Sequence, residues 1–158
     1  MSEDDDRDES DEERFDRNWN EMLQELRVVQ TGVQLLSGFL LTLPFTTRFA
    51  DLDVWQVRLY LALVLTSGLA VGVTLTPIIV HRRVFGQRVK ERVVMTGHVL
   101  TQVVMFLLAI IIVGISTLIF SVVMSWSAAL VVAVCSTAVL VGLLVVVPLL
   151  IGRSNSRA

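Results

Sequence analysis

Four long segments of this chain contain almost no charged residues, and they leave little sequence for any other kind of structure. Twelve of the fifteen acidic residues lie at or before Glu25, and the other three are Asp51, Asp53 and Glu91. A soluble domain would distribute charge over its whole surface. At about 1.5 Å per residue, each segment is long enough to cross roughly 30 Å of hydrocarbon. The predicted spans are residues 28–45, 57–80, 93–120 and 128–151.

These segments predict an all-α fold, a polytopic membrane protein with a bundle of four transmembrane helices over residues 28–151. Of the 158 residues, 54% are hydrophobic and only 18% are charged, which agrees with a chain lying mostly in lipid. The single cysteine, Cys135, lies inside an apolar run. The sequence therefore predicts neither a disulfide framework nor a redox motif.

Short segments flank the predicted membrane domain. Residues 1–13 hold nine acidic residues, and this acidic tail is predicted to be disordered because it has too few apolar side chains to offset the entropy of ordering. The tail either stays solvated or docks onto a basic partner. Residues 14–27 repeat apolar side chains at steps of three and four, which predicts a cytoplasmic amphipathic helix at the membrane interface, separate from the first span or continuous with it. Residues 152–158 form a short basic tail.

The basic residues predict the orientation in the membrane. With four spans, both termini and the loop between the second and third spans lie on one side, which holds eleven of the thirteen Lys and Arg residues. The other side holds only Arg48 and Arg58, so we expect a plasma-membrane protein with both termini in the cytoplasm. Arg58 is close in sequence to Asp51 and Asp53, which predicts a surface ion pair. The loop either only sets the topology or also binds anionic lipid head groups through Arg82, Arg83, Arg88, Lys90 and Arg92.

Polar residues inside the spans form the main candidate site. Gln30 and Gln34 lie four residues apart on the first span, and His98 and Gln102 repeat that spacing on the third. Both spans run outward from the cytoplasm, so these side chains are predicted to lie at nearly the same depth in the inner leaflet. We expect an inward-facing polar layer made of Gln30, Gln34, Thr74, Thr76, His98 and Gln102.

Two interpretations of this polar layer compete. In the first, the amides and the imidazole only bond across helices, with each bond contributing about 0.6 to 2 kcal/mol. In the second, the layer lines a vestibule open to the cytoplasm, or forms a proton-sensitive switch at His98, since imidazole titrates near neutral pH. No Asp or Glu lies within the hydrocarbon of the predicted spans, which argues against a conventional cation antiporter.

Small residues at a spacing of four predict where helices pack closely. Gly68 and Gly72 form such a pair on the second span, and Ala138 and Gly142 form one on the fourth. Small side chains allow two helix backbones in a membrane to approach each other. The pairs are expected either to pack helices within the chain or to form a homo-oligomer contact.

Three elements of the sequence resemble a known family: ELRVVQTGVQ at 25–34, LLTLPFTTRF at 40–49 and PIIVHRRVF at 77–85. They resemble a small integral-membrane family of unknown function that is frequent in actinobacteria, some of whose members carry the label sodium:proton antiporter. The resemblance covers roughly residues 20–98, and the last span matches only in its apolarity. It implies a four-helix membrane protein without an established activity.

The sequence carries no motif for a reaction. It has no Gly-rich phosphate loop, no metal-ligand spacing of Cys and His, no Ser–His–Asp set and no basic footprint for nucleic acid beyond one short loop. We therefore expect no cofactor and no enzymatic activity. The leading hypothesis is an accessory or scaffold subunit that acts through helix packing, with the bilayer and either another membrane protein or a second copy as partners. The alternative is a small transporter or proton-linked channel with an inner-leaflet polar path.

Overall fold

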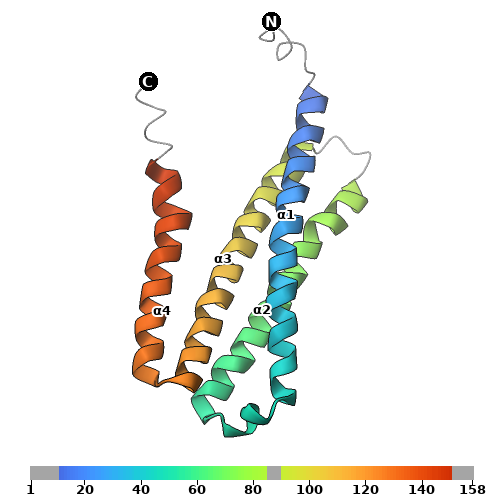
Figure 1. Ribbon diagram of the computed structural model, residues 1–158. Coiled ribbons are helices and arrows are strands. Elements are labelled where there is room, and N and C mark those ends of the chain that lie inside the picture. Colours follow the sequence, from blue (N-terminus) through green and yellow to red (C-terminus); the bar gives the residue numbers. More distant parts are fainter. Residues whose placement is uncertain (1–10, 85–89, 151–158) are drawn as a thin grey trace, which may run out of the picture. The chain divides into compact units, whose positions relative to one another are not determined.

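The computed structural model of the protein describes residues 11–84 and 90–150, which are almost entirely helical and include no strand. The chain has four long helices, α1 to α4, whose order along the chain can be followed in Figure 1. Short turns connect α1 to α2 and extend α4. The elements are α1 (Asp11–Thr42), the 3₁₀ turns η1 (Leu43–Phe45) and η2 (Thr47–Asp51), α2 (Val54–Val84), α3 (Lys90–Val123), α4 (Trp126–Val141) and the π-helical turn η3 (Gly142–Val146).

The predicted all-α fold class is confirmed, because four helices are long and apolar enough to cross a membrane. Residues 14–27 lie within α1, which passes into the first span without a break. The predicted acidic tail lies outside the described residues except for 11–13, which begin α1. The basic tail 152–158 also lies outside them. The apolar spans are Asn20–Phe45, Val54–Thr76, Val99–Val123 and Trp126–Leu150.

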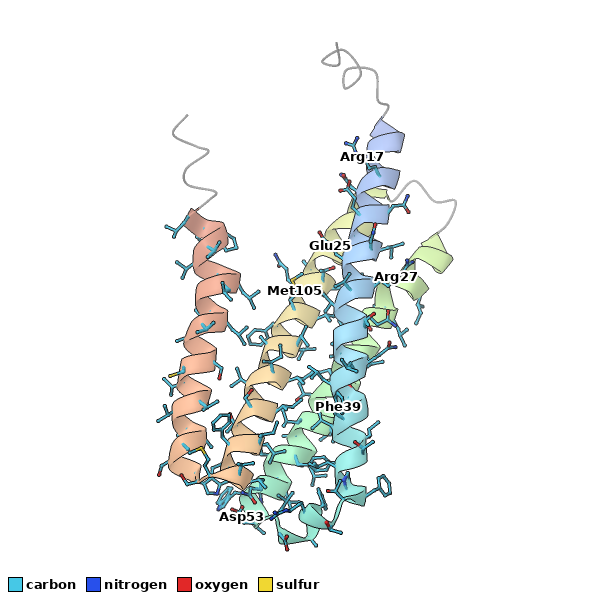
Figure 2. The ribbon with its side chains drawn as sticks, in the orientation of Figure 1. Arg17, Glu25, Arg27, Phe39, Asp53 and Met105 are labelled. Carbon is cyan, nitrogen blue, oxygen red and sulfur yellow. The ribbon has the colours of Figure 1, made fainter. Side chains whose placement is uncertain are left out.

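The chain divides into two compact units, and the first comprises the described residues of Met1–Leu36 and Ser67–Leu108. On the N-terminal half of α1, the charged residues Arg17, Glu25 and Arg27 are exposed (Figure 2). The buried residues of this unit recur at steps of mostly three and four along each helix, a spacing typical of left-handed helix packing. They are Met22, Leu26 and Val33 on α1, Ser67, Ala70 and Thr74 on α2, and Gly97, Thr101 and Val104 on α3.

The second unit comprises the described residues of Ser37–Thr66 and Ala109–Ala158, and it holds a small apolar core. Leu40, Tyr60, Leu63 and Leu118 form this core, with Ile115 and other half-buried residues packed against it. Figure 1 shows the α1–α2 connection and the α3–α4 turn at the same end of this unit. The core therefore joins parts of α1, α2 and α3 close to that end.

On α2, several large aliphatic side chains are exposed while small residues near them are buried. Leu65 is 74% exposed, whereas Ser67 is 5% exposed and Ala70 is fully buried. Lipid tails are as apolar as leucine, so large aliphatic side chains can face the bilayer while small residues bring helices together. This arrangement, together with the four apolar spans, fits a multi-pass membrane protein.

The π-helical turn near the end of α4 has a local cause in the sequence. Pro148 has no N–H to donate, and its ring would clash with the carbonyl four residues earlier, that of Leu144. In the turn before it, the Val147 N–H donates to the carbonyl of Gly142, five residues back. A single wide turn inside an α-helix is the usual form of π-helical structure. We infer that Pro148 favours the wide turn at this position.

Candidate functional site

All six residues of the predicted polar layer belong to the first unit. Thr74 is buried, Gln30 and Thr76 are half-buried, and Gln34 and Gln102 are exposed. The side chain of His98 lies outside the described residues, as do those of the five basic residues predicted to bind lipid head groups. The chain thus brings these positions into one unit, while the inward-facing layer itself stays a prediction.

The two threonine hydroxyls in this layer donate to their own helix. Thr74 Oγ1 donates to the Val71 carbonyl at 2.7 Å, and Thr76 Oγ1 donates to the Gly72 carbonyl at 3.2 Å. A hydroxyl has one donor and two acceptor lone pairs. These threonines therefore offer only their acceptor oxygens to a neighbouring helix, an amide donor or water.

The glycines predicted to pack helices do not meet other residues in the described part of the chain. Gly68 and Gly72 are exposed, and a Cβ built on either of them, or on Gly142, meets no described atom within 4 Å. Gly114 behaves differently, because a Cβ there would collide with the side chain of Leu63 and lie 3.2 Å from its Cγ. The sequence pattern missed Gly114, since large residues stand four positions away on both sides.

The best-defined side-chain arrangement lies in the second unit, at the end that holds the α1–α2 connection. We call it the polar clasp, and it comprises Asp53, Gln56, Ser121 and Trp126. Asp53 Oδ1 accepts from the backbone N–H groups of Trp55 at 2.7 Å and Gln56 at 2.9 Å. In return, Gln56 Oε1 accepts from the Asp53 N–H at 2.9 Å. This reciprocal pair is a capping box, which satisfies donors at the start of α2.

The polar clasp also links segments that are distant in sequence. Asp53 Oδ2 accepts from the indole Nε1 of Trp126 at 2.9 Å, at the start of α4 (the position of Asp53 is shown in Figure 2). Gln56 Nε2 donates to Ser121 Oγ at 3.3 Å, and Ser121 Oγ donates to the Leu118 carbonyl at 2.8 Å. Gln56 and Ser121 are both 7% exposed. The clasp therefore ties the start of α2 to the end of α3 and the start of α4.

The ion pair expected between Arg58 and the nearby aspartates is not found among the described residues. The Arg58 guanidinium instead lies over the ring of Trp55, with its carbon 4.9 Å from the ring centroid. Both oxygens of Asp53 instead accept hydrogen bonds from N–H donors. A cation over an indole face is attracted by the ring quadrupole.

The chemistry of the polar clasp is that of a structural tie. Each of its hydrogen bonds satisfies a donor or an acceptor within the protein, so the Asp53 carboxylate acts as an acceptor for chain segments. In the part of the chain that the structure describes, no three His, Cys, Asp or Glu side chains are placed to hold a metal ion. The sequence placed Asp53 in an expected ion pair with Arg58 and did not relate it to Trp126, because nothing local relates two positions 73 residues apart.

Hydrogen bonding lowers the pKa of Asp53 below its ordinary value of 3.8, chiefly through the Trp126 indole and then through the Gln56 N–H. A carboxyl whose pKa is depressed by folding stabilises the fold above its unfolded pKa, and this contribution is lost as pH falls through the folded pKa. We expect the wild-type protein to lose stability below about pH 4 more steeply than Asp53→Asn, which keeps an acceptor but does not titrate. Thermal unfolding in detergent between pH 7 and pH 3 measures this difference; parallel pH profiles for the two proteins would contradict it.

Comparison with known proteins adds one finding. A family model described as "Family of unknown function (DUF6328)" matches residues 8–148, which include the polar clasp and the predicted polar layer. No curated protein and no solved structure matches the chain.

Proposed function

The chain belongs to the family of unknown function DUF6328, and we propose that it is a non-enzymatic accessory or scaffold subunit that acts through helix packing. Its partner is either a helix of another membrane protein or a second copy of the chain. It resides in the plasma membrane with both termini in the cytoplasm, as its basic residues predict. The observation that carries this proposal is the exposure of α4.

The span that contains α4 buries the smallest share of its residues among the four spans. In the most apolar 18-residue window of each span, 28% of the residues are buried for Val54–Thr76 but none for Trp126–Leu150. Among the described residues of α4, only Ala129 is buried. A helix packed in a bundle normally buries one stripe of its surface. Beyond Ala129, the face that continues it is only half-buried, at Val132, Ala133, Ser136 and Leu140, which supports a role in which α4 receives a partner.

The surface of α4 also has the side chains that helix pairing in membranes requires. Ala138 is exposed, and the space around Gly142 is open to a distance of 4 Å among the described atoms. Association in lipid depends on close packing of backbones, which small residues permit and large residues prevent. The pair on α2, Gly68 and Gly72, is exposed and offers a second surface of this kind.

A bulky residue at Gly142, the first residue of η3 directly after α4, tests the proposal. We expect Gly142→Ile to reduce, by about tenfold or more, the partner or second copy recovered with the full chain after mild-detergent purification and quantitative mass spectrometry, since losing close packing of about 1.4 kcal/mol gives a tenfold loss of affinity. The thermal stability of the isolated chain should change little, because a Cβ on Gly142 meets no described side chain and no other helix within 4 Å.

Val139→Ile is the matched control, because it adds one methylene at a position of α4 that is already large and 59% exposed. Equal recovery of the partner with wild-type, Gly142→Ile and Val139→Ile proteins would contradict a packing role for this surface.

Purified protein in proteoliposomes provides a second readout. Sustained Na⁺/H⁺ exchange by the chain alone would overturn the scaffold proposal in favour of a transporter.

A further inference from the structure

The second unit contains an apolar pocket of about 220 Å³ that the helix packing leaves unfilled. The C-terminal end of α1, the turns η1 and η2, and the C-terminal part of α3 surround it. Ten of its eleven lining residues are aliphatic or aromatic, and the eleventh is Arg48. The pocket is therefore a hydrocarbon-lined site with a single cation.

The pocket has a buried floor and an exposed rim. Leu40 and Leu118, each 4% exposed, belong to the core of the unit and form the floor. Phe39 and Ile119 form part of the rim and are 65% and 52% exposed. An apolar rim of this kind opens toward lipid rather than water, because these residues lie in membrane-spanning segments.

The connection that carries Arg48 is held in place by packing and hydrogen bonds. The ring of Phe49 meets the ring of Tyr60 edge to face, with a centroid distance of 5.1 Å and an interplanar angle of 77°. Thr46 Oγ1 donates to the Leu43 carbonyl at 2.7 Å. Tyr60 is in turn part of the buried core. These contacts hold Arg48 at the pocket instead of leaving it on a free loop.

Arg48 lies between the ends of the first two spans, at Phe45 and Val54, which is the depth of the lipid head groups. It is exposed, and no carboxylate in the described part of the chain forms an ion pair with it. A guanidinium presents a planar fork of donors that matches a phosphate group. The cation at the mouth and the hydrocarbon walls are thus complementary to one anionic amphiphile.

We infer that this pocket binds one acyl chain of an anionic phospholipid, whose phosphate contacts Arg48. The volume supports a single chain, because it is below the roughly 300–1,000 Å³ of sites that enclose whole small molecules. The bilayer supplies such chains at this depth. No residue of α4 lines the site, so it does not depend on a partner on that helix.

The test uses the full-length protein reconstituted in vesicles of equal parts phosphatidylglycerol and phosphatidylcholine, followed by native mass spectrometry of the retained lipid. We expect the wild-type protein to retain phosphatidylglycerol in preference to phosphatidylcholine. Arg48→Gln should lower that preference about fivefold, the effect of one basic residue at an anionic membrane surface. Ile119→Trp, which extends a rim side chain into the pocket, should lower the retention of both lipids.

Arg58→Gln is the matched control. It removes the same charge on the side of the membrane where Arg48 is expected, but Arg58 does not line this pocket. An equal loss for Arg48→Gln and Arg58→Gln would show general attraction of anionic lipid and would overturn the proposal. Competition by soluble glycerol phosphate as effective as that by the whole lipid would show that only the phosphate binds, which would also overturn it. Thermal unfolding of each variant confirms that it is folded.

Discussion

Gly114→Val should destabilise the protein by about 1 to 3 kcal/mol, the usual cost of adding side-chain volume to a packed interior. A Cβ at residue 114 would collide with the side chain of Leu63, which is only 2% exposed and belongs to the core of the second unit. Leu63 therefore cannot swing into open space to make room. Unfolding of the purified protein in mixed micelles with increasing denaturing detergent measures the change in free energy.

Gly38→Val provides the control for this prediction, because a Cβ on Gly38 meets no described atom within 4 Å and Gly38 lies in the same unit. A second comparison isolates the contact itself. In the Gly114→Val, Leu63→Ala double variant, the loss of stability should fall short of the sum of the single losses by about 1 kcal/mol or more, because the two residues touch. Additive losses would show that the contact does not limit the packing.

Gln56→Leu should destabilise the protein by about 1 to 3 kcal/mol, because it removes the partner of buried hydrogen-bonding groups. Gln56 is 7% exposed, and its amide both accepts from the Asp53 N–H and donates to Ser121 Oγ. A leucine fills a similar volume and forms neither bond. The thermal unfolding midpoint in detergent, at a pH above 6, measures the loss while Asp53 remains ionised.

Gln56→Glu tests the same position with a charged side chain. Its carboxylate cannot donate to Ser121 and would be a nearly buried charge beside the ionised Asp53, so above pH 6 it should destabilise the protein at least as much as Gln56→Leu. Gln24→Leu serves as the control for the loss of an amide, because Gln24 is exposed on α1. Wild-type stability in Gln56→Leu would contradict the role assigned to the polar clasp.

The polar clasp and the core of the second unit both stabilise the end of this unit that holds the α1–α2 connection. The clasp anchors the start of α4 through Trp126, whereas most of α4 beyond Ala129 is exposed. A helix held at its start and only half-buried along one face beyond it still has surface available to a partner. The proposed scaffold function and the internal packing thus use different surfaces.

The sequence by itself determined the number of membrane-crossing helices and their approximate positions. The reason is that insertion of a segment into lipid depends on its length and summed apolarity, which are properties of the chain alone. The sequence also accounts for the π-helical turn near the end of α4, because Pro148 lacks a donor wherever it stands. The candidate positions of the polar layer, such as Gln30 and Thr74, could also be identified from the sequence, because they are polar residues within apolar segments.

Only the tertiary structure decided which face of each helix is buried and which distant residues meet. Lipid and protein interior are similarly apolar, so hydropathy does not distinguish a lipid-facing leucine such as Leu65 from a core leucine such as Leu63. For this reason the sequence pattern favoured Gly68, which is exposed, over Gly114, which touches Leu63. The bond between Asp53 and Trp126 likewise depends on how the helices bring two separate turns together.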